Sequence, residues 1–192
     1  MNFIFVLSIF TGVLMFAGFV LYFFSVIKNK ETRPNTASWV LWAFGDVITC
    51  ATYVGATEEW REFLSSCVSA TTCVILVVVF VFLGKFRRID KWDKIIVAVD
   101  ISVIILWLIF QSALFANLLI QISAIITFIP IIRSTAKNPR YEKPHAWFMW
   151  TTAYALTAVV VILLNSGHWA EVIYPLNYAL LHVIVGILAL RK

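Results

Sequence analysis

The stretch that decides the fold is FIFVLSIFTGVLMFAGFVLYFFSVI, residues 3–27, which contains no charged residue. A helix of roughly 20 apolar residues crosses about 30 Å of hydrocarbon, so this stretch is long enough to span a bilayer. The rest of the chain has a similar character, because 62% of its 192 residues are hydrophobic and only 13% are charged. Soluble domains carry about twice that charged share. We therefore expect an integral membrane protein surrounded by the lipid bilayer.

Six further apolar segments approach the same length. We predict an all-α membrane protein with seven transmembrane helices, of which the fourth is the shortest. The predicted spans are residues 3–27, 36–55, 63–84, 95–110, 114–132, 146–164 and 172–190.

The basic residues are confined to short gaps between these segments. Of the 15 Lys and Arg residues, all except Arg61 fall in the first, third and fifth gaps or at the carboxyl terminus. Cytoplasmic loops collect positive charge, so we expect a multi-pass protein of the cell or inner membrane with its amino terminus outside and its carboxyl terminus in the cytoplasm. This confinement argues against a nucleic-acid partner, although the formal net charge is +5.

Two short tryptophan motifs mark an internal repeat. Trp39-Val-Leu-Trp42 opens the second predicted helix and Trp147-Phe-Met-Trp150 opens the sixth, at an offset of 108 residues (147 minus 39). Because a single helix separates the two three-helix units, both have the same orientation, and an axis along the membrane normal relates them. We divide the chain into a first triple-helix bundle (1–84), a basic loop with an inverting linker helix (85–112) and a second triple-helix bundle (113–192).

This layout resembles the PQ-loop superfamily in its SWEET sugar-facilitator form. The family carries a Pro-Gln pair near the inner end of the first helix of each unit, where this chain has Pro130-Ile131 and Tyr22-Phe23. The paired WxxW segments also resemble PnuC-type vitamin transporters, in which such a motif lies at the nicotinamide riboside site. In SWEET proteins an asparagine on the last helix of each unit faces the substrate, and Asn177 matches it in the second unit.

Aromatic and polar residues recur at steps of three and four along the second and sixth predicted helices, which places them on one stripe of each helix. In the second helix the stripe holds Trp39, Trp42, Asp46, Thr49 and Tyr53. In the sixth helix it holds Trp147, Trp150, Tyr154, Thr157 and Val161. We expect these stripes to line a substrate site at the membrane midplane. An alternative is that the tryptophans anchor their helices at the headgroup level.

Asp46 is expected near the bilayer centre, where a carboxylate is costly unless it is paired, protonated or hydrated. His182 falls at a similar depth on the seventh predicted helix, at 1.5 Å of rise per residue. One interpretation is that the two residues form a proton-coupling pair. The other is that Asp46 bonds a neighbouring hydroxyl while His182 packs as a neutral residue.

Asn117 and Gln121 share one face of the fifth predicted helix, where they either line the cavity or form interhelical hydrogen bonds. Pro130 and Pro175 interrupt helical hydrogen bonding and are candidate hinges, although simple bends are as common.

The three cysteines, Cys50, Cys67 and Cys73, have no CxxC spacing and an odd count. We therefore expect small packing residues, without a disulfide framework, a metal site or a cofactor.

The composition and layout together favour a transporter for a small polar solute, sugar-, nucleoside- or vitamin-like, that works by alternating access. The alternative is a non-transporting membrane receptor or scaffold of the same fold. An enzyme is not expected, because no catalytic or metal-binding spacing is present. The sequence leaves a homo-oligomer open.

Overall fold

The protein was analysed as a computed structural model, which describes residues 3–56, 60–110, 113–164 and 169–191. Within these ranges it contains seven α-helices, one short 3-10 helix and no strand. The helices are α1 (Phe3–Lys28), α2 (Thr36–Ala56), α3 (Trp60–Phe82), α4 (Lys91–Phe110), α5 (Ala113–Lys137), η1 (Pro139–Tyr141), α6 (Pro144–Leu164) and α7 (Trp169–Leu190).

The predicted all-α class is confirmed, and four helices are long and apolar enough to cross a membrane. These four are α1, the segment Leu64–Phe82 of α3, α6, and the segment Val172–Leu190 of α7. Large apolar side chains stay exposed on the outer faces, such as Phe16 on α1 and Leu180 on α7. A continuous surface of this kind suits lipid better than water.

The helix α4 begins earlier than its apolar pattern indicates. The fourth span was predicted from residue 95, whereas α4 begins at Lys91. The backbone N–H of Asp93 donates to Oδ1 of Asp90 (2.8 Å), and the N–H of Asp90 donates to Oδ2 of Asp93 (3.0 Å). This reciprocal cap satisfies free N–H groups at the start of the helix. The polar residues before position 95 can therefore form the first turn of α4.

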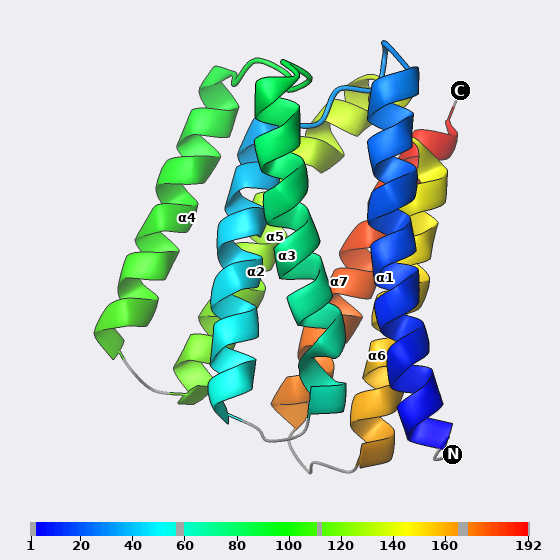
Figure 1. Ribbon diagram of the computed structural model, residues 1–192. Coiled ribbons are helices and arrows are strands. Elements are labelled where there is room, and N and C mark those ends of the chain that lie inside the picture. Colours follow the sequence, from blue (N-terminus) through cyan, green and yellow to red (C-terminus); the bar gives the residue numbers. More distant parts are fainter. Residues whose placement is uncertain (1–2, 57–59, 111–112, 165–168, 192) are drawn as a thin grey trace.

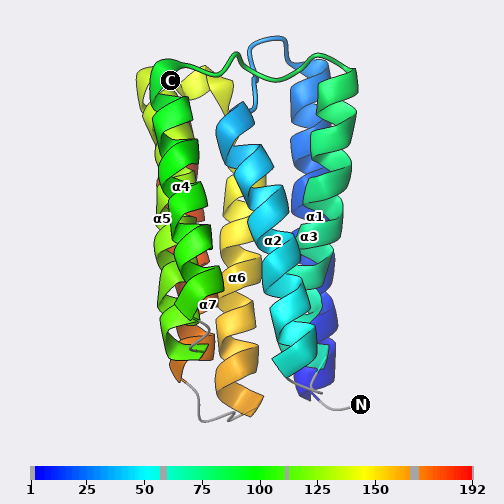
Figure 2. The ribbon, with the colours of Figure 1, turned by 90° about the vertical axis from the view of Figure 1, so that its left-hand side faces the viewer.

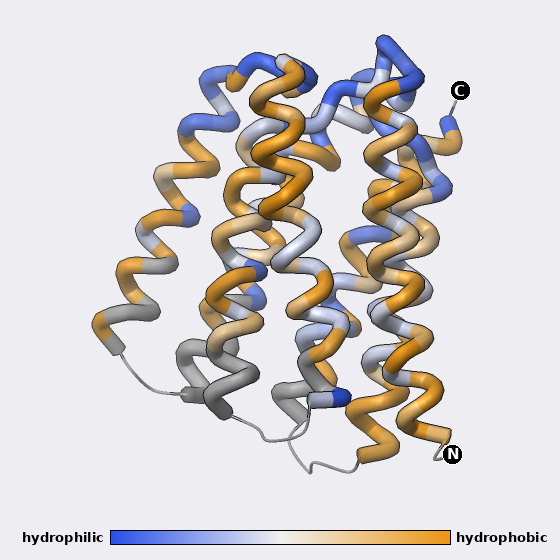
Figure 3. Tube along the Cα trace, in the orientation of Figure 1, coloured by the Kyte–Doolittle hydropathy of each residue, from blue (hydrophilic) through white to orange (hydrophobic). Residues whose placement is uncertain are grey.

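Successive helices run antiparallel, and the two described ends of the chain lie at opposite ends of the bundle (Figure 1). Hydrophilic residues gather at the end that carries the carboxyl terminus, and hydrophobic residues dominate the middle (Figure 3). We call this hydrophilic end, with the α1–α2, α3–α4 and α5–α6 loops, the basic end.

The predicted repeat assigns six of the helices to two groups of three. In the first group (α1, α2, α3), α3 contacts both other helices, and in the second group (α5, α6, α7), α7 does the same. Between the groups, α1 packs against α6 and α2 against α5, while α4 lies against α5 and the edge of α2 (Figures 1 and 2). The division of the chain at residues 84 and 112 stays a prediction.

One hydrogen bond joins α3 of the first group to α7 of the second. The Ser66 hydroxyl donates to the Tyr174 hydroxyl at 3.3 Å. The two residues are 108 positions apart (174 minus 66), as are the two tryptophan motifs.

The loops at the basic end are tied to one another. The Thr36 hydroxyl donates to the Arg87 carbonyl, and the Arg87 N–H donates to the Pro34 carbonyl at 3.1 Å. Arg87 also forms an ion pair with Asp93 at 2.8 Å. Nearby, Asn35 caps α2 by accepting from the Ser38 N–H at 3.0 Å. These bonds join the α1–α2 loop to the α3–α4 loop.

The interpretation of all three cysteines as packing residues is wrong for two of them. Cys50 on α2 and Cys67 on α3 form a disulfide, with their Cα atoms 5.1 Å apart. Cys73 is free and buried. The pairing was missed because the two cysteines are 17 positions apart, and the end of one helix and the start of the next lie between them. Antiparallel packing, which a spacing rule does not represent, brings the two sulfurs together.

We predict that alkylation of the denatured, unreduced protein labels one cysteine of the three, and that alkylation after reduction labels all three. Intact-mass spectrometry measures both numbers. Cys50→Ser should lower the free energy of unfolding by about 2–4 kcal/mol, the usual effect of losing a disulfide that closes a short loop. Labelling of three cysteines without reduction would contradict the pairing.

Candidate functional site

A small cavity lies between the two helix groups, enclosed by side chains from every helix except α4. Its volume is about 20 Å³, which is room for about one water molecule. Rings from both groups form most of its wall, including Phe19, Phe128 and Tyr178. Six residues that the sequence analysis singled out also line it: Trp39, Trp42, Asp46, Trp150, Tyr154 and His182. We call this space the central cavity.

The two tryptophan pairs meet crosswise beside the central cavity. The ring centroids of Trp39 and Trp150 are 6.3 Å apart, and those of Trp42 and Trp147 are 6.0 Å apart. The repeat exchanges these two contacts, because Trp39 corresponds to Trp147 and Trp42 to Trp150. All four indoles are buried, which does not fit tryptophans that anchor helices at a headgroup layer.

Asp46 is buried with only part of its hydrogen-bonding capacity used. The Ser69 hydroxyl on α3 donates to Oδ2 of Asp46 at 2.7 Å. Its other oxygen, Oδ1, is buried and has no hydrogen-bond partner among the described residues. The predicted hydroxyl partner is therefore present, but it serves one oxygen of the carboxylate.

His182 shares the central cavity with Asp46 and bonds to its own helix. Its Nδ1 lies 2.7 Å from the Tyr178 carbonyl oxygen. A carbonyl can only accept, so Nδ1 carries the proton of this bond. The imidazole packs against aromatic rings, with its centroid 5.1 Å from that of Tyr154. No hydrogen bond or ion pair joins Asp46 to His182 in the described part of the chain, and proton coupling stays a prediction.

Trp147 and Asn177 do not line the central cavity. The Trp147 indole points toward the basic end and donates to Oε2 of Glu142 at 3.1 Å. The Asn177 amide donates to Oε1 of Gln121 at 2.9 Å, which links α7 to α5. Gln121 thus forms an interhelical hydrogen bond, which is one of the two roles that the sequence predicted for it. The side chains of Asn117 and Tyr53 lie outside the described residues.

The two candidate hinge prolines lie inside long helices. Pro130 is within α5 and Pro175 is within α7, and both helices continue past the proline. Both prolines are buried. Their role as hinges stays a prediction.

Gly18 of α1 allows Trp150 of α6 to approach closely. A Cβ atom at position 18 would lie 2.5 Å from Nε1 of Trp150 and 2.7 Å from Cδ1, inside any real contact distance. In this position the indole N–H donates to the Met15 carbonyl of α1 at 3.3 Å. Because Gly18 has no side chain, the Trp150 indole can occupy this position and form one wall of the central cavity.

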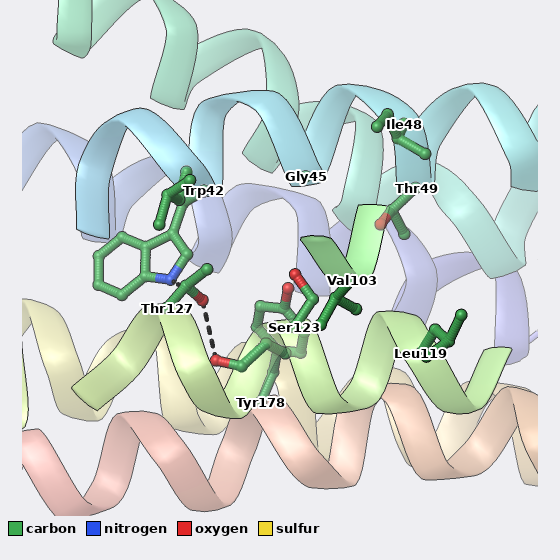
Figure 4. A pocket seen from close by; sticks show the side chains of 11 residues that line it. Trp42, Gly45, Ile48, Thr49, Val103, Leu119, Ser123, Thr127 and Tyr178 are labelled. Carbon is green, nitrogen blue, oxygen red and sulfur yellow. Dashed lines mark hydrogen bonds between the residues drawn. The ribbon is translucent and has the colours of Figure 1, made fainter. Parts of the chain in front are cut away.

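A second cavity, of about 40 Å³, lies between α2, α4, α5 and α7 (Figure 4). It shares Trp42 and Tyr178 with the central cavity, so these two side chains separate the spaces. The Trp42 indole is held by a hydrogen bond to the Thr127 hydroxyl at 3.0 Å. We call this space the side cavity.

Sequence reasoning missed Glu142, a buried carboxylate at the basic end. It lies between η1 and α6, is only 2% exposed, and accepts from the Tyr22 hydroxyl at 3.2 Å as well as from Trp147. Burial raises the pKa of Glu142 from 4.5 to about 8, and the two hydrogen bonds oppose this shift. Glu142 stands in a basic, proline-containing loop typical of a solvated surface, so no signal in the sequence marked it.

Comparisons with protein-family models, with curated proteins and with solved structures find no match to this chain. Within the described residues, no cluster of three or more His, Cys, Asp or Glu side chains is placed to hold a metal ion. The chemistry of the site therefore follows from the central cavity and its aromatic and carboxylate lining.

We predict that Gly18→Ala lowers the free energy of unfolding by about 1–3 kcal/mol, because the new methyl group displaces the Trp150 indole. The matched control is Gly45→Ala on α2, where a Cβ would meet nothing within 4 Å. That change should be neutral or stabilising by up to about 1 kcal/mol, since alanine is the better helix former. Denaturant unfolding in detergent measures both, and equal effects would contradict the Gly18 contact.

We predict that the protein loses stability as the pH rises from about 4.5 to about 8. A raised carboxyl pKa in the folded state means that folding favours the protonated form, so its stabilisation is complete below 4.5 and is lost as the pH passes 8. Glu142→Gln should reduce the difference in melting temperature between pH 5 and pH 9. The control is Glu31→Gln, at an exposed ion pair with Arg140. An unchanged pH slope in Glu142→Gln would refute this role.

Proposed function

We propose that this chain is a multi-pass membrane transporter for a small polar solute, of the sugar-, nucleoside- or vitamin-like class, which works by alternating access around the central cavity. The observation that carries the proposal is a cavity between the two helix groups, lined by three tryptophans of the crossed pairs and by a carboxylate with one unpartnered oxygen. Solute sites are mostly apolar, with a few placed polar groups.

The proposal includes seven membrane crossings, with the amino terminus outside and the basic end in the cytoplasm. The alternating helix directions and the hydrophilic basic end support it (Figures 1 and 3). In this arrangement α2, α4 and α5 cross as well, and each of them has polar residues that are buried within the bundle. For example, Asp100 of α4 is buried and accepts a hydrogen bond from Ser123 of α5.

Contacts between the two groups on both sides of the central cavity supply two gates for alternating access. Toward the basic end, Tyr22 of α1 bonds Glu142, and the Arg33 N–H donates to the Tyr141 carbonyl at 3.2 Å. Toward the opposite end, the Thr157 hydroxyl of α6 donates to the Ser65 hydroxyl of α3 at 3.1 Å. Opening either set would connect the cavity to one side of the membrane.

The arrangement of two parallel three-helix groups supports placing the chain among PQ-loop transporters of the SWEET type, with the tryptophan motifs pointing toward the PnuC type. This placement is part of the proposal. The alternative of a non-transporting receptor or scaffold shares the fold and differs in whether bound solute crosses the bilayer.

We predict that purified protein in liposomes takes up at least one solute from a panel of sugars, nucleosides, vitamins and amino acids. Trp150→Phe removes one indole hydrogen bond at the cavity wall and should lower uptake roughly 5- to 10-fold, as expected for a loss of about 1 kcal/mol. Asn177→Ala, outside the cavity, should change uptake less than about 2-fold on the same scale.

The control for this experiment is Phe44→Ala, on the outward face of α2, where the side chain is exposed. Equal uptake by Trp150→Phe and the wild type would contradict a site at the central cavity. Solute binding without uptake would assign the chain to the receptor or scaffold class.

A further inference from the structure

The carboxylate of Asp46 has no counter-charge within the described residues. Its side chain is 5% exposed, and its hydrogen bond comes from the neutral hydroxyl of Ser69. An ionised carboxylate buried among apolar groups is costly unless a positive group or further donors compensate it. The unpartnered oxygen Oδ1 belongs to a residue that lines the central cavity. The wall of the cavity therefore offers one carboxylate oxygen that a positive group or a hydrogen-bond donor would satisfy.

The remaining wall is aromatic, and aromatic faces attract cations. The electron-rich faces of Trp, Tyr and Phe bind ammonium groups, and tryptophan does so best. Three tryptophans, Trp39, Trp42 and Trp150, stand around the cavity with the carboxylate of Asp46. A carboxylate surrounded by rings is the chemistry of a site for an organic cation. Its attraction is strengthened because little water is present to screen it.

This wall offers a neutral polyhydroxyl solute few hydrogen-bond partners. Sugar recognition needs several donors and acceptors, and the amides of Asn177 and Gln121 are bonded to each other outside the cavity. Besides Asp46, the wall offers the Trp39 indole N–H and a few hydroxyl and imidazole groups, set among rings. A bare metal cation prefers a shell of several oxygen ligands, whereas here the unpartnered carboxylate oxygen is surrounded mainly by rings. The volume of about 20 Å³ holds one water-sized group, and a primary ammonium group is of that size.

We infer that the central cavity recognises a small organic cation through an ammonium group, which is held between the carboxylate of Asp46 and the faces of the surrounding tryptophans. This inference rests on the proposed function and narrows its solute to a cation, in place of a neutral sugar. The rest of the cation enters when one of the gates opens.

The test uses two pairs of probes that differ in charge and little in shape. Choline is compared with 3,3-dimethylbutan-1-ol, its uncharged isostere, and ethanolamine is compared with ethylene glycol. Each is added to the purified full chain in detergent, and the melting temperature is measured, with sodium chloride at equal concentration as the ionic control. At least one cation should raise the melting temperature by roughly 3 °C or more at saturation, while its neutral partner and sodium leave it unchanged.

Two variants separate charge from structure. Asp46→Asn keeps the size of the side chain and removes the charge, so it should abolish the shift while its own melting temperature stays at or above that of the wild type. Ser69→Ala keeps the carboxylate and removes its hydroxyl donor, so it should retain the shift. Loss of the shift in Asp46→Asn together with its retention in Ser69→Ala supports the inference.

The inference is overturned if the neutral partners stabilise the protein as much as the cations, if the shift persists in Asp46→Asn, or if neither cation produces one. When neutral solutes still bind and are taken up into liposomes, only the cation class fails. When no solute of either kind binds or is taken up, the proposed function fails with it.

Discussion

The close approach of α1 and α6 at Gly18 determines how the two helix groups meet. Because no Cβ occupies that point, the Trp150 indole lies against the α1 backbone and donates to the Met15 carbonyl. In this position Trp150 also contacts Phe19 and Trp39, with ring centroids 4.9 and 6.3 Å away. One indole thus joins helices from both groups, and the central cavity is the space that this aromatic packing leaves.

Two of the buried carboxylates, Glu142 and Asp46, differ in how their oxygens are bonded. Glu142 accepts a hydrogen bond on each oxygen, from Tyr22 and Trp147, and its environment favours the protonated form. Asp46 accepts only one, from Ser69. Glu142 therefore connects the two helix groups at the basic end. In Asp46, one carboxylate oxygen has no hydrogen-bond partner among the described residues and can accept from a bound group.

Much of the architecture could be predicted from the sequence because the bilayer imposes a length and an apolar surface on each helix. The stripe on α2 and α6 could also be predicted, since helical periodicity fixes which residues share a face. Three features depend on which helices become neighbours, and no pattern within one segment encodes that. These are the pairing of Cys50 with Cys67, the burial of Glu142 beneath α1, and the bond from Asn177 to Gln121.

The disulfide makes the two halves of the repeat covalently different. Cys50 and Cys67 join α2 to α3. Residues 113–192 contain no cysteine, so α6 and α7 carry no such link. A rearrangement that opens the central cavity therefore leaves α2 and α3 tied to each other at this point, whereas α6 and α7 are held by non-covalent contacts.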